Sequence, residues 1–256
     1  MAGHRTQMSG PQLSTEHAVR LAVQLSRWQP DADKCRALPA ASTLLLLDFD
    51  CTLAAHHMWK TLRTAEGEAA ASANPAAFYL EIFGGAQRLE KCANFLRAMR
   101  ASGTAVAILS NGFEAEIQAA LQQVDLAEFI DQVFGAESQD EAGCEDKPGF
   151  VARLCITAAA QAKPFTHILF ADDDRFNYPG EHDGNVDAGD AWTLESDESL
   201  AAVHLPPEAR AQLPPLPSTR MVAWPAGDGE GAMGGLTPVD FDGIVAALGQ
   251  AGVGTS

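Results

Sequence analysis

The segment Thr43–Phe49, TLLLLDF, constrains the fold of this chain most, because its apolar residues run without a break up to Asp48. A strand with one solvated face would alternate apolar and polar residues, so this run predicts a strand buried on both faces. Such strands belong to parallel sheets that helices cover on both sides. Similar apolar runs follow at Thr104–Leu109, Thr166–Ala171 and Arg220–Trp224.

Helical patterns lie between these runs. The clearest covers Ala86–Ala101, where apolar side chains recur at helical spacing. Further helices are predicted over Phe113–Gln123 and Pro148–Gln161, the second with proline in its first turn. Near the end of the chain, Thr237 and Asp240 lie three residues apart before an amphipathic pattern, which predicts a capped helix. The alternation of strands and helices predicts an α/β domain with a mostly parallel sheet.

Two regions depart from this alternation, and they suggest how the chain is organised. We expect a helical N-terminal extension over residues 1–40 and one catalytic domain over 41–256. Within that domain, small insertions are predicted near 61–80, which is rich in Ala and Glu, and near 178–218. The second insertion carries many Gly, Asp, Glu and Pro residues, which is typical of an acidic surface excursion.

The net charge of −17 restricts the classes of partner that the protein could bind. General nucleic-acid binding and binding to anionic membranes both need a basic surface, so neither is expected. A phosphorylated substrate remains compatible, because a bound metal ion can reverse the charge locally. The five cysteines are scattered without a C-x-x-C pair, and residues 1–11 are polar. Together with the lack of a long apolar run, these features predict a cytoplasmic protein with reduced thiols and no membrane span.

Ligands of open parallel sheets bind beyond the carboxyl ends of the strands. Polar residues stand at these places or at the start of the following helix: Asp48 and Asp50, Ser110 and Asn111, Lys147, and Asp172–Asp174. In an extended segment, Asp48 and Asp50 would point the same way, with Phe49 turned into the core. One carboxylate could attack phosphorus while the other protonates the leaving oxygen and then activates water. Carboxylates beside a phosphate need a hard cation such as Mg²⁺.

These residues resemble a known family. D-F-D-C-T-L over 48–53 resembles the D-x-D-x-T signature of the haloacid dehalogenase (HAD) superfamily. I-L-S-N-G over 108–112, Lys147-Pro148 and L-F-A-D-D-D-R-F-N over 169–177 resemble the second, third and fourth motifs, in the same order. The resemblance implies a Rossmannoid three-layer α/β/α hydrolase domain. Within the family, the second aspartate of D-x-D marks phosphatases and phosphotransferases.

The resemblance also implies roles for single residues. It implies Asp48 as the nucleophile and Asp50 as the general acid/base. Phosphate contacts are implied for Ser110, Asn111 and Lys147, and Mg²⁺ ligands for Asp48, Asp172 and the backbone carbonyl of Asp50. Asp173 is expected as a nearby or second-layer acid, and Thr52 and His56 are further candidates for support or substrate contact. Since adjacent histidines point in different directions, at most one of His56 and His57 should act.

The spacing between the motifs leaves no room for a large cap domain, although residues 61–80 could form a small one. The predicted function is therefore a Mg²⁺-dependent phosphatase with an open site, which hydrolyses a phosphomonoester through an aspartyl-phosphate on Asp48. A phosphotransferase or phosphomutase would use the same intermediate. A non-catalytic scaffold that binds a basic partner through the acidic 178–218 segment is the alternative from another class. On that reading, Asp172–Asp174 would be a solvated turn.

Overall fold

The structure is a computed structural model that describes residues 41–144, 146–160, 164–178, 186–193, 219–226 and 235–251. The described strands form one sheet in the order β3-β2-β1-β4-β6-β5. They are β1 (Thr43–Leu47), β2 (Ala105–Leu109), β3 (Gln132–Phe134), β4 (His167–Asp172), β5 (Ala191–Thr193) and β6 (Arg220–Pro225). All neighbouring pairs are parallel except β5 with β6, which is antiparallel.

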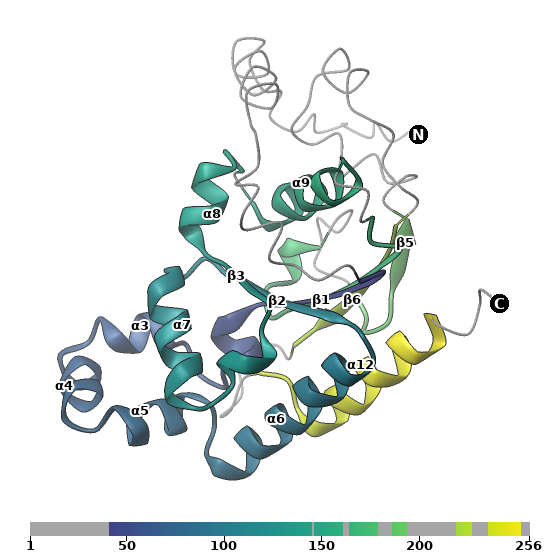
Figure 1. Ribbon diagram of the computed structural model, residues 1–256. Helices are drawn as coiled ribbons and strands as arrows, with labels where there is room; N and C mark the ends of the chain where they lie inside the picture. Colours follow the sequence, from purple (N-terminus) through teal and green to yellow (C-terminus); the bar gives the residue numbers. More distant parts are fainter. Residues whose placement is uncertain are drawn as a thin grey trace, which may run out of the picture.

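Helices lie on both faces of the sheet, with α9 on one side and α6 and α12 on the other (Figure 1). The described helices are α3 (Met58–Leu62), α4 (Ala65–Ala73), α5 (Pro75–Ile82), α6 (Ala86–Ala101), α7 (Glu114–Gln123), α8 (Ala136–Glu141), α9 (Lys147–Ala160) and α12 (Pro238–Ala251). This confirms the predicted three-layer α/β/α architecture with a mostly parallel sheet. Among these described helices, none has the length and apolar character needed to cross a bilayer.

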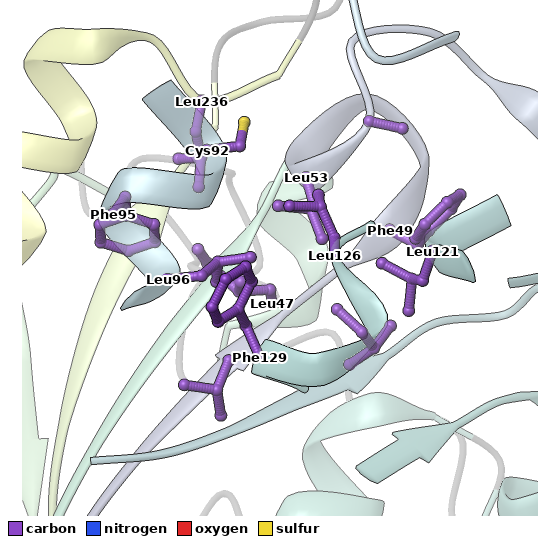
Figure 2. Close-up of a cluster of buried hydrophobic side chains, with 14 of the residues drawn as sticks. Leu47, Phe49, Leu53, Cys92, Phe95, Leu96, Leu121, Leu126, Phe129 and Leu236 are labelled. Carbon is purple, nitrogen blue, oxygen red and sulfur yellow. The ribbon is translucent and has the colours of Figure 1, made fainter. Parts of the chain in front are cut away.

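The leucines of β1 explain why its sequence is apolar throughout. Leu45 and Leu47 belong to the core on the side of α6 and α12, whereas Leu44 and Leu46 belong to the core on the side of α9. Figure 2 shows part of the first core, where Leu47 shares a cluster with side chains of α6, of α7 and of the segment before α12. Burial on both faces therefore follows from the alternation of side chains along one central strand.

The predicted elements agree with the structure to within a few residues. The helix predicted over Ala86–Ala101 is α6 with the same bounds, and the four predicted strands correspond to β1, β2, β4 and β6. Two elements were missed, the short helix α8 and the antiparallel edge strand β5 (Ala191–Thr193), which lies inside the predicted 178–218 insertion. The expected helical extension over 1–40 and most of the 178–218 insertion lie outside the described residues.

The predicted insertion near 61–80 folds as part of the helices α3, α4 and α5, which project to one side of the domain (Figure 1). Thr64 caps α4 by accepting a hydrogen bond from the backbone N–H of Gly67, and Asn74 caps α5 in the same way. Gly67 is required by a close approach, because a Cβ there would lie 2.0 Å from the carbonyl oxygen of Thr61.

A half-buried arginine joins this region to the end of the chain. The guanidinium of Arg88 donates hydrogen bonds to the carbonyl oxygens of Thr52, Leu53, Phe83 and Leu236, at 2.8–3.1 Å. These carbonyls belong to the loop after β1, the end of α5 and the segment before α12. Charged donors satisfy buried carbonyls strongly, so Arg88 fixes the loop that carries Asp48 and Asp50 against the core.

Candidate active site

A pocket of about 500 Å³ opens at the carboxyl ends of β1, β2 and β4. It contains nearly all the polar residues that the sequence places at strand ends, together with the beginning of α3. Its lining residues are Asp48, Asp50, Cys51, His57, Trp59, Lys60, Ser110, Asn111, Gly112, Lys147, Asp172, Asp173, Asp174 and Asn177. None of residues 61–80 lines the pocket, so the possible small cap does not cover it.

The strand order brings residues from distant parts of the chain together here. β1 lies between β2 and β4, and Leu47 is in register with Ala171 of β4. The backbone N–H of Asp48 donates to the carbonyl oxygen of Ala171 at 2.8 Å. Asp48 and Asp172 therefore leave adjacent strands at the same level, as expected for parallel neighbours.

The loop after β1 differs from the expected extended segment. Beyond Asp48 the chain forms an irregular turn over Phe49–Leu53, in which Cys51 adopts a left-handed backbone conformation with φ 58°. Phe49 is buried in the core as expected, and both Asp48 and Asp50 line the pocket. The turn, rather than the alternation of a strand, sets the directions of the two carboxylates.

The backbone of Met58 and the side chain of His57 hold the Asp50 carboxylate. Its Oδ1 accepts a hydrogen bond from the backbone N–H of Met58 at 2.7 Å. Its Oδ2 lies 2.8 Å from Nδ1 of His57, a distance suited to an ion pair, although the ring is not aligned for a hydrogen bond. Burial raises the pKa of Asp50, His57 lowers it and the Asp48 charge raises it, with a net increase. A raised pKa favours the protonated form that a general acid needs.

Lys147, the first residue of α9, connects the two strand-end aspartates. Its Nζ donates hydrogen bonds to Oδ1 of Asp48 and to Oδ2 of Asp172, both at 2.7 Å. All three side chains are buried. Burial lowers the pKa of Lys147, but the carboxylates of Asp48 and Asp172 together raise it more, so it lies above its ordinary value. Lys147 therefore brings a positive charge to the lining of the pocket.

Three carboxylates form a cluster that could hold a metal ion. Oxygen atoms of Asp48, Asp172 and Asp173 all lie within 4.8 Å of one another. Burial, followed by the charge of Asp48, raises the pKa of Asp172 to about 7 and that of Asp173 to about 6. A cation among these oxygens would relieve this repulsion, and oxygen is the donor that Mg²⁺ prefers. The donor set therefore fits Mg²⁺, and it includes Asp173, which sequence analysis placed in a supporting role.

Residues after β4 hold Asp172 in place. Its Oδ1 accepts hydrogen bonds from Nδ2 of Asn177 at 3.0 Å and from the backbone N–H of Asp174 at 2.9 Å. The hydroxyl of Tyr178 accepts from the backbone N–H of Asp172 and donates to its carbonyl oxygen. Neither Asn177 nor Tyr178 was a candidate from the sequence. Asn177 is the last residue of the 169–177 motif, and Tyr178 had only its position soon after the acidic cluster as a signal.

The loop after β2 forms the opposite wall. Ser110 is buried, and its Oγ accepts a hydrogen bond from the backbone N–H of Gly112 at 3.3 Å. Asn111 is exposed and also lines the pocket. Nε2 of Gln139, on α8, donates to the carbonyl oxygen of Ser110 at 2.8 Å and fixes the loop. Gln139 had no sequence signal, because only the packing of α8 brings it to this loop.

Two candidates from the sequence do not reach the pocket. Thr52, within the turn after β1, is fully buried, and its Oγ1 has no hydrogen-bond partner among the described residues. His56 does not line the pocket, and its backbone N–H donates to the carbonyl oxygen of Ile82 at 3.1 Å. The neighbouring His57 lines the pocket instead, together with Trp59 and Lys60. Of the two adjacent histidines, His57 is therefore the one at the pocket, and a supporting role of His56 stays a prediction.

No protein-family model and no curated protein matches this chain. Among solved structures, the HAD domain of the effector protein Lem4 from Legionella pneumophila, an inactive mutant, matches with a TM-score of 0.41 and 14% identity over 82% of this chain and 98% of that chain. A crystal structure of a dehalogenase has a TM-score of 0.33 and 17% identity over 54% of this chain and 78% of that chain. The residues of the pocket, rather than this distant likeness, carry the functional interpretation.

Proposed function

We propose that this chain is a Mg²⁺-dependent phosphatase of the HAD type that hydrolyses a phosphomonoester through an aspartyl-phosphate on Asp48. One observation carries the proposal, namely the contact of the Asp48 carboxylate with Lys147 at 2.7 Å, beside Asp172 and Asp173. A nucleophilic carboxylate needs a positive neighbour to admit an anionic phosphate, and Lys147 lies in that position. Asp50 lines the same pocket and supplies the second carboxylate.

In the first step, an oxygen of Asp48 attacks phosphorus and forms the aspartyl-phosphate bond. The bond from phosphorus to the leaving oxygen breaks, and that oxygen takes a proton from Asp50. The raised pKa of Asp50, which is caused first by burial, supports this role as an acid. Lys147, held between Asp48 and Asp172, would balance the negative charge on the transferring phosphoryl oxygens.

In the second step, Asp50 is ionised and accepts a proton from a water molecule as the water oxygen attacks phosphorus. The bond between phosphorus and Asp48 breaks, so inorganic phosphate leaves and the carboxylate is restored. Ser110 and Asn111 line the pocket and would contact the phosphoryl oxygens. When bound by Asp48, Asp172 and Asp173, Mg²⁺ would supply charge neutralisation and orientation of the phosphate.

The cost of the buried charges supports an enzyme over a scaffold. Asp48, Lys147 and Asp172 are all buried, and burying ions costs free energy that even good pairing offsets only in part. Active sites accept such costs because the same charges act on the substrate. A scaffold that used only an acidic surface would not need them. A phosphotransferase would share the first step and differ in the acceptor of the second.

Phosphate release from phenyl phosphate tests the proposal. We expect turnover in millimolar Mg²⁺ and at least a hundredfold loss after chelation, because the acidic lining would then repel the substrate. Inorganic phosphate and phenol should appear in equal amounts. Phenol without inorganic phosphate, in the presence of an alcohol acceptor, would identify a phosphotransferase. If neither product forms in the presence of Mg²⁺, the scaffold becomes the better interpretation.

The role of Asp50 leads to a second prediction, on substrates with different leaving groups. Asp50→Asn cannot donate a proton, and an alkoxide needs that proton more than a phenolate does. We therefore expect turnover of an alkyl phosphate to fall at least about tenfold more than turnover of an activated aryl phosphate. The measurement is kcat for both esters in wild type and variant. Equal losses on both esters would mean that Asp50 only supports the site.

A further inference from the structure

An aromatic side chain stands at the mouth of the pocket without a role in the proposed chemistry. Trp59 lies in the first turn of α3, directly after the residues that contact Asp50, and it lines the pocket. Its exposed fraction is 39%, which makes it one of the few large apolar side chains left open among the described residues. Large exposed rings beside a concave site are a common means of ligand recognition.

The indole is held in place although it is exposed. The guanidinium of Arg63 lies over the Trp59 ring at 4.4 Å from its centroid, and its Nη1 donates to the carbonyl oxygen of Trp59. Both Nη atoms of Arg63 donate to the carboxylate of Glu116 on α7, at 3.2 and 3.1 Å. The same guanidinium lies 5.6 Å from the ring of Phe113. A bidentate pair that also stacks on a ring restricts the indole, so binding would cost little ordering of this side chain.

The charge of the pocket disfavours substrates whose leaving group carries a negative charge in addition to the phosphate. Five aspartates line it, against two lysines, and Lys147 is already paired with Asp48 and Asp172. A leaving group with its own negative charge would meet this acidic lining. An uncharged flat ring would instead find the indole and gain apolar contact with it.

We propose that Trp59 determines substrate specificity and that the preferred substrates are phosphomonoesters whose leaving group carries an uncharged flat ring. The ring stacks on the indole while the phosphate lies on Asp48 and Lys147. This inference rests on the proposed phosphatase function, since it concerns the leaving group of that reaction. Trp59 acts by binding, so its effect belongs in KM and not in the chemical step.

Benzyl phosphate and cyclohexylmethyl phosphate provide the test. Both are phosphate monoesters of uncharged primary alcohols of similar size, and the leaving groups differ mainly in whether the ring is flat and aromatic. In millimolar Mg²⁺, wild type is expected to prefer benzyl phosphate about tenfold in kcat/KM, through KM. Trp59→Leu should reduce that preference to within about twofold and leave kcat/KM for the cyclohexyl ester nearly unchanged. Trp59→Phe should keep most of the preference, because a flat ring remains.

Phe176→Leu is the matched control. Phe176 is 70% exposed and follows the acidic cluster, but it does not line the pocket, so the preference should persist in this variant. Equal kcat/KM of wild type for the two esters would overturn the inference and leave the phosphatase proposal standing. An equal loss on both esters in a folded Trp59→Leu protein would assign Trp59 a merely structural role and would also overturn it. Failure of wild type to release phosphate from either ester would instead overturn the proposed function.

Discussion

Asp48→Asn is expected to lower kcat by at least about 10³-fold while the fold is retained. The amide keeps the shape of the side chain but lacks the negatively charged carboxylate that attacks phosphorus. It also removes one of the three carboxylates of the acidic cluster. Lys147 keeps Asp172 as its partner at 2.7 Å, so the variant does not bury an unpaired ammonium. The measurements are kcat on an aryl phosphate and the melting temperature of both proteins.

Asp125→Asn is a suitable control for this variant. It makes the same chemical change at an exposed turn, where the backbone has φ 57°, a conformation that asparagine tolerates. Wild-type turnover is expected. If a folded Asp48→Asn protein retained more than a tenth of wild-type turnover, covalent catalysis by Asp48 would be ruled out. Trapping of a phosphorylated wild-type protein that is absent in Asp48→Asn would support the same intermediate directly.

Mg²⁺ is expected to raise the melting temperature of wild type, and Asp172→Asn should abolish the response. A ligand that binds only the folded state stabilises it by RT ln(1 + [L]/Kd), about 2.7 kcal/mol at a hundredfold excess over Kd. For a domain of this size, that corresponds to a rise of about 5–10 °C. Asp172→Asn removes the charge of a fully buried ligand candidate and keeps an oxygen that can still accept from Asn177. Catalysis should be lost with the Mg²⁺ response.

Asp174→Asn separates the acidic cluster from general charge effects on melting. Asp174 lies two residues after Asp172 and is exposed. Its carboxylate accepts a hydrogen bond from the backbone N–H of Phe176. Since its carboxylate is not part of the three-residue cluster, this variant should melt with the same Mg²⁺ response as wild type. A wild-type protein whose melting and turnover ignore Mg²⁺ would make the cluster a solvated turn. A full response in Asp172→Asn would place the ion elsewhere.

Much of the fold could be predicted because its signals are local. An unbroken leucine run can be stable only where both faces of a strand are covered, and β1 is such a strand. The periodicity over Ala86–Ala101 defines α6, since helical spacing places its apolar side chains on one face. The short edge strand β5 had no comparable signal, because three residues are too few to establish a period.

The chemical character of the site could also be predicted, but the full set of residues that line the pocket could not. Acids directly after buried strands must meet at one edge of a parallel sheet, which identified Asp48, Asp50 and Asp172 as candidates. The chain turns at Cys51, where φ is positive, and of the two adjacent histidines that follow, His57 lines the pocket. Sequence spacing does not encode this direction, because one residue with positive φ redirects the chain.

Contacts between distant segments were decided by the tertiary structure alone. The order β2-β1-β4 places Asp48 beside Asp172, and the start of α9 brings the Nζ of Lys147 to both. The sequence by itself determined that strands buried on both faces would end in carboxylates, because hydrophobic patterning and chain direction are local properties. Strand order and helix packing determined which other side chains meet those carboxylates, namely Lys147, Asn177 and His57. The free energy of such contacts depends on residues far apart in the chain, so local patterns do not reveal them.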